Sequence, residues 1–513
     1  MLGGLAGPVN LAPLLLVLLA LSALASSGCA AHGGPRPGPT APGTNATAGR
    51  PAAARASTAG VSLTGQGPIR AGAAWRVITP DLSSGTPPRM AGFGQGRDAT
   101  GVHDDLYARA LVIEVGEASI ALVALDLIGF FHDDVVRIRE EIKARHPEVG
   151  AGYVMVCSTH THAGPDLIGL WTPAGVPLDP DYVAHVRSEA ADAVAEAWRA
   201  RRPARLSFVS ARLPELVHDS RLPEVIDPTA VLMKADSADG RDTIATLVNF
   251  ASHPESLGRG NTLLSSDYPG WTRHVLEEEF GGVAIFTSGA IGGLLTPLGV
   301  GLTDPVNGEA IPEKSFSLMQ AYGDRLARAL IAVWRASAEE NGKGSSFVDR
   351  GTLDVRSSAL RVPLDNPRFI RGLTEGRIRP REVGDDGTLK SEEAVVTLRA
   401  AGSKEPLARL ACVPGEIYPE LVLGGIQDPQ DPGADFPGTP AERPLGPMLG
   451  SRHRLVVSLC NDELGYIIPM SEWDEKPPFA YGRDSPQYGE MNSVGPRVAP
   501  LVLRTFEDLL SRP

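Results

Sequence analysis

The sequence is poor in cysteine and in positive charge. Its 513 residues include four cysteines without a Cys-x-x-Cys spacing, and Cys157, Cys412 and Cys460 are the three that follow Cys29. This odd number excludes a disulfide scaffold and predicts that each of the three is a small buried strand residue. Lys and Arg number 48 against 61 Asp and Glu, which gives a net charge of −13. Nucleic acid is therefore not an expected partner, because phosphate-binding surfaces need clustered cations.

The apolar run at residues 11–25 is too short to span a bilayer comfortably and has the length of a signal-peptide core. Residues 26–29 then resemble the lipobox at which bacterial lipoproteins are cut and lipidated on Cys29, although Ser26 stands where Leu is usual and no Lys or Arg precedes the run. We therefore expect residues 1–29 to be an export signal. Two outcomes stay open: a cell-envelope lipoprotein, in the periplasm or outer membrane, held at a membrane surface through Cys29, or cleavage near Ala25 and secretion.

Residues 30–68 have little to bury, because Ala, Gly, Pro, Ser and Thr dominate them, and they are predicted to be a disordered tether. The folded body is expected at 69–513. Within it we find no second linker of this kind and no internal repeat. One large domain, or two closely fused lobes, is the expected organisation.

Hairpin and helix patterns alternate along this body. Hairpins are predicted at 109–125, 229–251 and 395–414. Helices are predicted after a cap at Asp133 or Asp134 and at 181–200, 268–280, 316–338 and 497–511. This mixture predicts an α/β fold in which mixed β-sheets with many hairpins are flanked by helices, rather than a purely parallel doubly wound sheet.

The motif THTHAGP at residues 159–165 follows an apolar strand pattern at 153–157. On an extended backbone, residues two apart point to the same side, so His160 and His162 are expected to face one pocket. One imidazole would bind a metal while the other handles protons. A hydrogen-bonded pair of interior histidines is the alternative for this motif taken alone.

Three further strand patterns end in residues that bind cations. His253 closes the motif NFASHP (249–254), shortly before SSD (265–267). Glu416 follows a Pro-Gly turn, and Tyr466 follows the strand pattern at 456–460. Ligand pockets form readily at strand ends, and two imidazoles with a carboxylate and one more oxygen suit Zn²⁺ with an open position for water. Taken singly, Glu416 is equally well read as a charge at a helix N-terminus and Tyr466 as a core aromatic.

In this order the motifs resemble the catalytic, N-terminal domain of the neutral (alkaline, non-lysosomal) ceramidases, over nearly all of the folded body. The resemblance implies one zinc ion per chain, bound by His160, His253, Glu416 and Tyr466. It also implies that His162 is the family's second catalytic His, Arg221 its substrate-facing Arg and Tyr488 its second Tyr.

Two departures from the family pattern matter. Family members carry a GDVSP segment whose Ser has been proposed as nucleophile, whereas residues 288–297 read SGAIGGLLTP. Either Thr296 takes that role or no side chain does. We expect attack by water, and an acyl adduct on Thr296 or Ser288 would contradict this expectation. The sequence ends near Pro513, so the immunoglobulin-like C-terminal domain of full-length ceramidases is expected to be missing.

The expected reaction is hydrolysis of the amide bond of ceramide or a related N-acyl lipid by metal-activated water. His162 would move the proton, and Tyr488 and Arg221 would donate to the oxyanion. Hydrolysis of a non-ceramide N-acyl amide and a metal-stabilised surface lipoprotein without turnover are the alternatives. A structural Ca²⁺ or Mg²⁺ at a remote site also stays open.

Overall fold

The computed structural model describes residues 60–84, 87–173, 175–340, 347–428 and 430–511. The predicted export signal, Cys29 and the predicted tether up to residue 59 lie outside the described residues. The rest of that tether differs from the prediction, because strand β1 begins at Ser62. Residues 62–68 pair with β13 through their backbone, and Val61 and Leu63 pack against the core, so a segment with few apolar side chains is still ordered.

The described chain contains a twelve-stranded mixed sheet, in agreement with the predicted fold class. β1 (Ser62–Val77) is the strand that connects the parts of this sheet. Residues 62–68 pair with β13 (Arg350–Pro363), residues 69–77 pair with β3 (Tyr107–Val115), and residues 70–71 also pair with β6 (Arg202–Arg212). Three groups of strands therefore extend from one long strand.

The three groups continue outward from β1 as follows: β3, β4 (Ala118–Leu125) and β5 (Tyr153–Ser158); β6, β8 (Thr229–Ser237), β9 (Thr243–Phe250) and β11 (Val283–Ser288); β13, β14 (Thr388–Ala400), β15 (Ala408–Cys412) and β17 (His453–Val457). Each group is antiparallel until its last pair, and the pairs β4/β5, β9/β11 and β15/β17 are parallel. The carboxyl ends of these parallel strands are where the candidate motifs lie.

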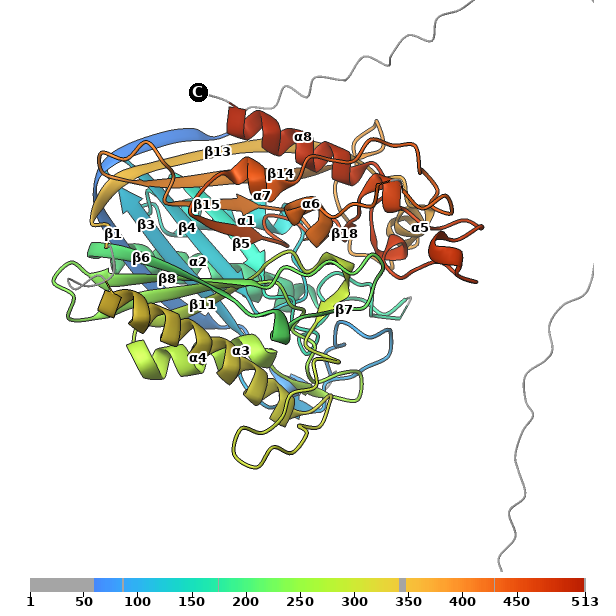
Figure 1. Ribbon diagram of the computed structural model, residues 1–513, viewed down its shortest axis with the longest axis horizontal. Helices are drawn as coiled ribbons and strands as arrows, with labels where there is room; N and C mark the ends of the chain where they lie inside the picture. The colour runs from blue at the N-terminus through green and yellow to red at the C-terminus, as the bar shows by residue number, and fades with distance from the viewer. Residues whose placement is uncertain (1–59, 85–86, 174, 341–346, 429, 512–513) are drawn as a thin grey trace, which may run out of the picture. The chain divides into compact units, whose positions relative to one another are not determined.

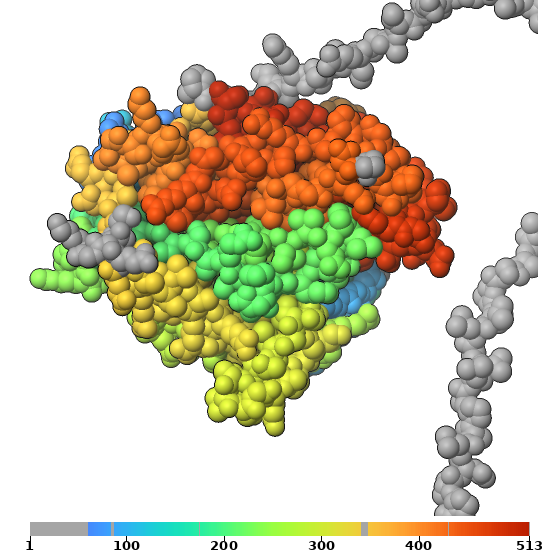
Figure 2. Space-filling view, viewed as in Figure 1, coloured from blue at the N-terminus to red at the C-terminus, as the bar shows by residue number. Residues whose placement is uncertain are grey.

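Apolar side chains from all three strand groups share one core that contains no helical residue. The helices cover the outer faces (Figure 1): α1 (His132–Arg145) and α2 (Pro180–Arg199) pack on the β3–β5 group, α3 (Asp267–Phe280) and α4 (Phe316–Glu340) on the β6–β11 group, and α8 (Val498–Ser511) on β13 and β14. In the space-filling view the C-terminal part of the chain, orange to red, lies on one side of the visible face, and the green and yellow segments lie on the other (Figure 2).

The remaining elements are short. The helices are α5 (Pro367–Thr374), α6 (Pro419–Leu423) and α7 (Leu445–Leu449), and the strands are β2 (Gly101–Val102), β7 (His218–Asp219), β10 (Leu263–Leu264), β12 (Leu295–Thr296), β16 (Glu416–Ile417) and β18 (Tyr466–Ile467). 3-10 turns span Leu82–Ser84, Pro214–Leu216, Gly292–Leu294, Met470–Glu472, Ala480–Gly482 and Glu490–Asn492.

The predicted hairpins and long helices are present, with ends that shift by a few residues. Asp133 and Asp134 lie in the first turn of α1 and not at its cap, which is Phe131. Acidic side chains there still favour the helix through its dipole. None of the helices in the described ranges is both long and apolar enough for a membrane crossing.

The cysteines differ from the prediction. Cys412 and Cys460 form a disulfide with their Cα atoms 5.1 Å apart, and Cys157 is a buried free thiol. The odd count and the separation of 48 residues concealed this pair. Because β15 and β17 are parallel neighbours, the end of β15 and the loop after β17 are brought together.

Candidate metal centre and active site

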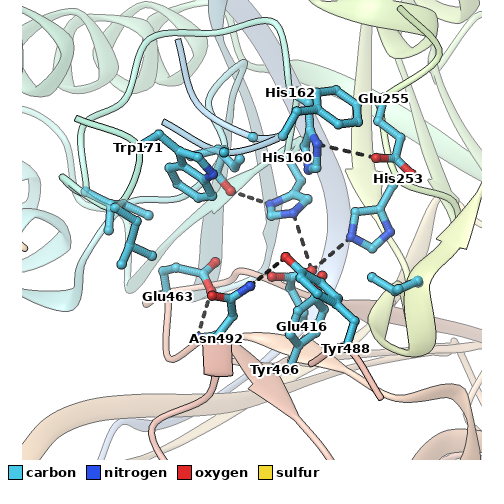
Figure 3. A pocket seen from close by; sticks show the side chains of 18 of the residues that line it. His160, His162, Trp171, His253, Glu255, Glu416, Glu463, Tyr466, Tyr488 and Asn492 are labelled. Carbon is cyan, nitrogen blue, oxygen red and sulfur yellow. Dashed lines mark hydrogen bonds and ion pairs between the residues drawn. The ribbon is translucent and has the colours of Figure 1, made fainter. Parts of the chain in front are cut away.

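Four loops that follow strands of the large sheet meet around one cavity of about 520 Å³ (Figure 3). The THTHAGP motif follows β5, the His-Pro motif follows β9, β16 follows β15, and the segment 461–466 follows β17. In sheets with parallel strands, ligands bind beyond the carboxyl ends of the strands, where loops from several strands converge. The predicted convergence of the motifs is thus present in the fold.

His160 and His253 contact the same carboxylate oxygen. His160 Nε2 lies 3.3 Å and His253 Nε2 lies 3.0 Å from Oε2 of Glu416. On the far side of each ring, Nδ1 hydrogen-bonds to a backbone carbonyl oxygen, that of Ile128 at 2.5 Å for His160 and that of Leu295 at 2.8 Å for His253. All three side chains are buried.

These contacts determine which ring nitrogen can bind a metal. A carbonyl oxygen only accepts, so Nδ1 of each ring must carry the proton, and the lone pair of a neutral ring is then on Nε2. Metal-binding histidines typically have this outer hydrogen bond, because it orients the ring and selects the tautomer. The His160, His253 and Glu416 donor atoms therefore fit a divalent cation.

The Glu416 carboxylate is stabilised in its charged form. Burial acts to raise its pKa, but the adjacent His160 and His253 outweigh burial and lower the pKa to about 2. The same contacts raise the pKa of His253 against the opposing effect of burial. The site thus holds a negative charge between two imidazoles, which is the electrostatic setting that a cation needs.

His162 lines the cavity beside this centre. Within the described chain neither ring nitrogen makes a hydrogen bond, and Nδ1 lies 3.5 Å from Oε2 of Glu255. Its ring makes edge contacts with Phe93 and with both His160 and His253, at centroid distances of 5.0, 5.0 and 5.6 Å. Burial first, and then the nearby His160, His253 and Arg97, hold its pKa well below the ordinary value. A neutral imidazole with a free lone pair therefore faces the cavity.

Tyr466 and Tyr488 line the other side of the cavity. Tyr466 is buried and lies directly opposite Glu416 in the β16/β18 register. Burial, with Glu416 next, raises the pKa of Tyr466 well above the ordinary value. Tyr488 is half exposed, its ring centroid is 6.0 Å from that of Tyr466, and its hydroxyl accepts a 2.6 Å hydrogen bond from the Asn492 amide. A phenol is thus available at the rim of the cavity.

Arg221 is placed differently from the prediction. Its guanidinium is 3% exposed and is paired with Glu490 at 2.7 Å. It also donates to the backbone carbonyl oxygens of Tyr488 and Glu472, and it is not among the residues that line the cavity. Since these contacts occupy both terminal nitrogens and the side chain is buried outside the cavity, we interpret Arg221 as a residue that positions Tyr488 and not as a donor to substrate.

Thr296 and Ser288 both lie near the centre, with their hydroxyl groups already bonded. Thr296 Oγ1 donates to Oε1 of Glu255 at 2.5 Å, and Ser288 Oγ donates to the backbone carbonyl oxygen of Thr159 at 2.7 Å. Neither residue lines the cavity. Of the two, only Thr296 is bonded to a carboxylate, the kind of partner that activates a hydroxyl nucleophile.

Comparison with known proteins places this geometry in context. Residues 86–296 match the sequence model of a family described as neutral/alkaline non-lysosomal ceramidase, N-terminal. The resemblance inferred from the motifs is confirmed. The matched ceramidase segment contains His160, His162 and His253, and it indicates an enzyme, a hydrolase that acts on an amide bond.

Solved ceramidase structures share the fold. The chain superposes on the crystal structure of neutral ceramidase from Pseudomonas aeruginosa with a TM-score of 0.62 and 18% identity, over 86% of this chain and 74% of that one. A structure described as a ceramidase complexed with C2 gives a TM-score of 0.61 and 17% identity, over 86% and 75%. At these identities the likeness concerns the fold. No curated protein sequence matches significantly.

The cavity includes residues that the sequence did not single out. Glu255 directly follows the His-Pro motif, so its position was a signal that went unused. Glu463 lies three residues before Tyr466, in the segment after the strand pattern at 456–460 that indicated Tyr466 alone. Aromatic and aliphatic side chains form the walls, and no motif marked them: Phe93, Ile128, Ile168, Leu170, Trp171, Leu294 and Met491.

Proposed function

We propose that the chain is a zinc-dependent amidohydrolase that cleaves the amide bond of ceramide or of a related N-acyl lipid. The observation that carries the proposal is the approach of His160 Nε2 and His253 Nε2 to one oxygen of Glu416, beside the unbonded ring of His162. Two imidazoles and a carboxylate are a donor set of catalytic zinc sites. The family match over residues 86–296 supports the same reaction.

One zinc ion would be held by His160, His253, Glu416 and Tyr466. Imidazole nitrogen and hard oxygen donors suit zinc, although the same types of ligand also accept other divalent ions. When bound, zinc supplies Lewis acidity, which polarises a carbonyl group and makes water a better nucleophile near neutral pH. The hydrogen bonds from the two rings to Ile128 and Leu295 keep the Nε2 atoms directed toward Glu416.

His162 is the proton carrier in this proposal. Because its pKa lies well below the ordinary value, the ring is neutral and can accept a proton from the attacking water. It can then return that proton to the nitrogen of the leaving amine. Glu255, 3.5 Å from Nδ1, orients the ring for both transfers.

We favour water over Thr296 as the nucleophile. Thr296 is 5% exposed, its hydroxyl donates to Glu255, and the residue does not line the cavity. His162, in contrast, lines the cavity, so a water molecule bound there would lie beside its ring. In this scheme Thr296 holds Glu255 in place and forms no acyl intermediate.

The cavity accounts for recognition of a lipid amide. Trp171, Leu170 and Met491 offer apolar surface for hydrocarbon, whereas the polar groups gather around Glu416 and His162. Tyr488 would donate to the oxyanion of the tetrahedral state, where one well-placed donor is worth about 3 kcal/mol. Such walls accept acyl chains on other amines too, so a different N-acyl amide is the alternative substrate.

We propose that the protein is exported, as a lipoprotein lipidated on Cys29 or as a secreted enzyme. The apolar run at 11–25 and the lipobox-like segment motivate this. The Cys412–Cys460 disulfide supports it, since disulfides persist in oxidising compartments. A lipid anchor would hold the enzyme at the membrane surface that contains its substrate.

The experiment measures bound metal and amide hydrolysis together, for the wild type and for His162→Ala. Substrates are a fluorogenic N-acylsphingosine and short-chain N-acyl amides. We expect zinc in both proteins, turnover of N-acylsphingosine by the wild type, and a loss of at least about 100-fold in His162→Ala. Turnover of short-chain amides alone would identify another substrate. Bound metal without turnover of any amide would identify a non-catalytic metalloprotein and reject the proposal.

A further inference from the structure

Glu463 brings a second carboxylate to the metal centre. It follows β17 in a loop where Leu459, Asn461 and Gly465 all have positive φ angles, of 54°, 65° and 77°. Non-glycine residues rarely adopt this conformation, and it concentrates at functional sites. The loop directs the Glu463 side chain into the cavity next to Glu416 (Figure 3).

Only one of the two oxygens of the Glu463 carboxylate has a hydrogen-bond partner among the described residues. Glu463 is 6% exposed, and Oε1 accepts a 2.8 Å hydrogen bond from the backbone N–H of Gly465. Oε2 is buried and has no hydrogen-bond partner among the described residues. A buried polar oxygen without a partner is unfavourable, so an unpaired carboxylate oxygen indicates a missing ligand.

The guanidinium of Arg381, which lies beside this loop, does not supply that partner. Arg381 pairs with both oxygens of the neighbouring Asp462, at 2.7 and 2.6 Å, and donates to the backbone carbonyl oxygen of Glu463. Within the described chain its ion pair is with Asp462 and not with the Glu463 carboxylate. The packing around Glu463 is also tight, because a Cβ atom on Gly129 would lie 2.9 Å from Cγ and 3.0 Å from Oε2. The side chain is therefore confined next to Glu416 and kept apart from the available arginine.

The position of Glu463 matches that of a metal ligand. One nitrogen of His160, one oxygen of Glu416 and one oxygen of Glu463 all lie within 4.8 Å of one another, and all three residues are buried. His160 and Glu416 also belong to the zinc set proposed above. Two adjacent buried carboxylates repel each other unless a proton or a cation lies between them.

We propose that Glu463 is a further protein ligand of the same divalent ion, which is then held by two imidazoles, two carboxylates and the Tyr466 phenol. This inference rests on the metal site of the proposed function. Two carboxylates balance the charge of a divalent ion in a buried site, which neutral imidazoles and a phenol do not do. The expected consequence is tighter binding of the ion than His160, His253 and Glu416 alone provide.

The test is a metal-affinity measurement on the purified full chain. Metal is removed, and the dissociation constant for Zn²⁺ is measured by competition with a chromophoric chelator for the wild type, Glu463→Gln, Glu416→Gln and Tyr466→Phe. Glu393→Gln is the matched control, because Glu393 is completely buried, neither of its carboxylate oxygens has a hydrogen-bond partner among the described residues, and it lies outside the cavity. We expect Glu463→Gln to weaken Zn²⁺ binding at least tenfold and Glu393→Gln to leave it unchanged.

Co²⁺ substitution provides a readout that a change in folding does not imitate. The visible absorption bands of bound Co²⁺ report its ligands, so they should shift in Glu463→Gln and, with a smaller change, in Glu463→Asp, which keeps the charge. If both Glu463 variants keep wild-type affinity and wild-type bands while Glu416→Gln loses affinity, Glu463 is not a ligand. That result would overturn the role of Glu463 and leave the rest of the metal site in place. Failure of the wild type itself to bind Zn²⁺ would instead reject the metal site of the proposed function.

Discussion

The Arg221 guanidinium donates a 2.7 Å hydrogen bond to the backbone carbonyl oxygen of Tyr488. This contact joins the loop after β7 to the segment that carries the rim tyrosine, 267 residues later in the chain. Both terminal nitrogens of the guanidinium also donate to the Glu490 carboxylate, and both side chains are buried. Arg221 therefore fixes the position of the Tyr488 segment from outside the cavity.

Replacing Arg221 by Ala should lower stability and activity together. The change leaves Glu490 buried without its partner, and removing one member of a buried ion pair costs about 3–5 kcal/mol. Chemical denaturation measures this cost. Arg137→Ala is the control, since it removes an exposed pair with Glu140 on α1 and should change the free energy of unfolding by less than about 1 kcal/mol. An Arg221→Ala protein of wild-type stability that has lost only turnover would restore a direct role with substrate.

Thr296→Val separates the two candidate nucleophiles. Val keeps the shape of Thr but cannot donate to Glu255 or form an acyl-enzyme. If water attacks, as we propose, kcat should fall less than about tenfold, because the variant loses only the hydrogen bond to Glu255 and the 3.2 Å hydrogen bond that Thr296 accepts from the Leu298 N–H. A nucleophilic Thr296 predicts near-complete loss of turnover, together with an acyl adduct on Thr296 that mass spectrometry detects after rapid quenching of the wild type.

The sequence predicted this site because its motifs follow strands that end in the same region. His160, His253 and Glu416 each come directly after an apolar strand pattern, and the parallel pairs β4/β5, β9/β11 and β15/β17 bring those ends together. Hairpins and long helices were predictable for a similar reason, since their hydrophobic periodicity is local.

Features that depend on distant packing were not predictable in this way. β1 is shared between strand groups, and this sharing orders residues 62–68 in spite of their composition. The Cys412–Cys460 disulfide depends on the pairing of β15 with β17. The burial of Arg221 depends on a segment near the C-terminus. Glu255 and Glu463 carry no motif of their own, and only the packed cavity shows that they face His162 and Glu416.

Gly92→Ala should impair catalysis by displacing His162. Gly92 has φ +80°, and a Cβ atom there would lie 2.6 Å from Cγ of His162, too close for the ring to keep its place. Gly96→Ala is the matched control, because Gly96 has φ +89° but no atom within 4 Å of the added Cβ. Both variants should lose about 1–2 kcal/mol from backbone strain, whereas kcat should fall only in Gly92→Ala. Equal kcat in the two variants would argue against a catalytic His162.

His453 should make stability depend on pH below neutrality. Burial, and secondly the adjacent Arg452, lower its pKa to about 4 from an ordinary value of 6.5. Between these values the unfolded chain binds more protons than the folded chain, so the free energy of unfolding falls as the pH falls from 6.5 to 4 and this contribution is constant below 4. The loss from this one group is at most about 3 kcal/mol.

His453→Gln should remove that part of the pH dependence. Urea unfolding of the variant and the wild type at pH values from 7 to 4 gives two curves whose difference isolates His453. The gap between them should change steadily across the window, in the direction that makes the variant relatively more stable at pH 4 than at pH 7. His274→Gln, on the exposed side of α3, is the control for loss of one histidine and should follow the wild-type curve. A constant gap for His453→Gln would show that the His453 side chain, hydrogen-bonded to Ser210 and stacked on Phe208, accommodates its proton in the folded state.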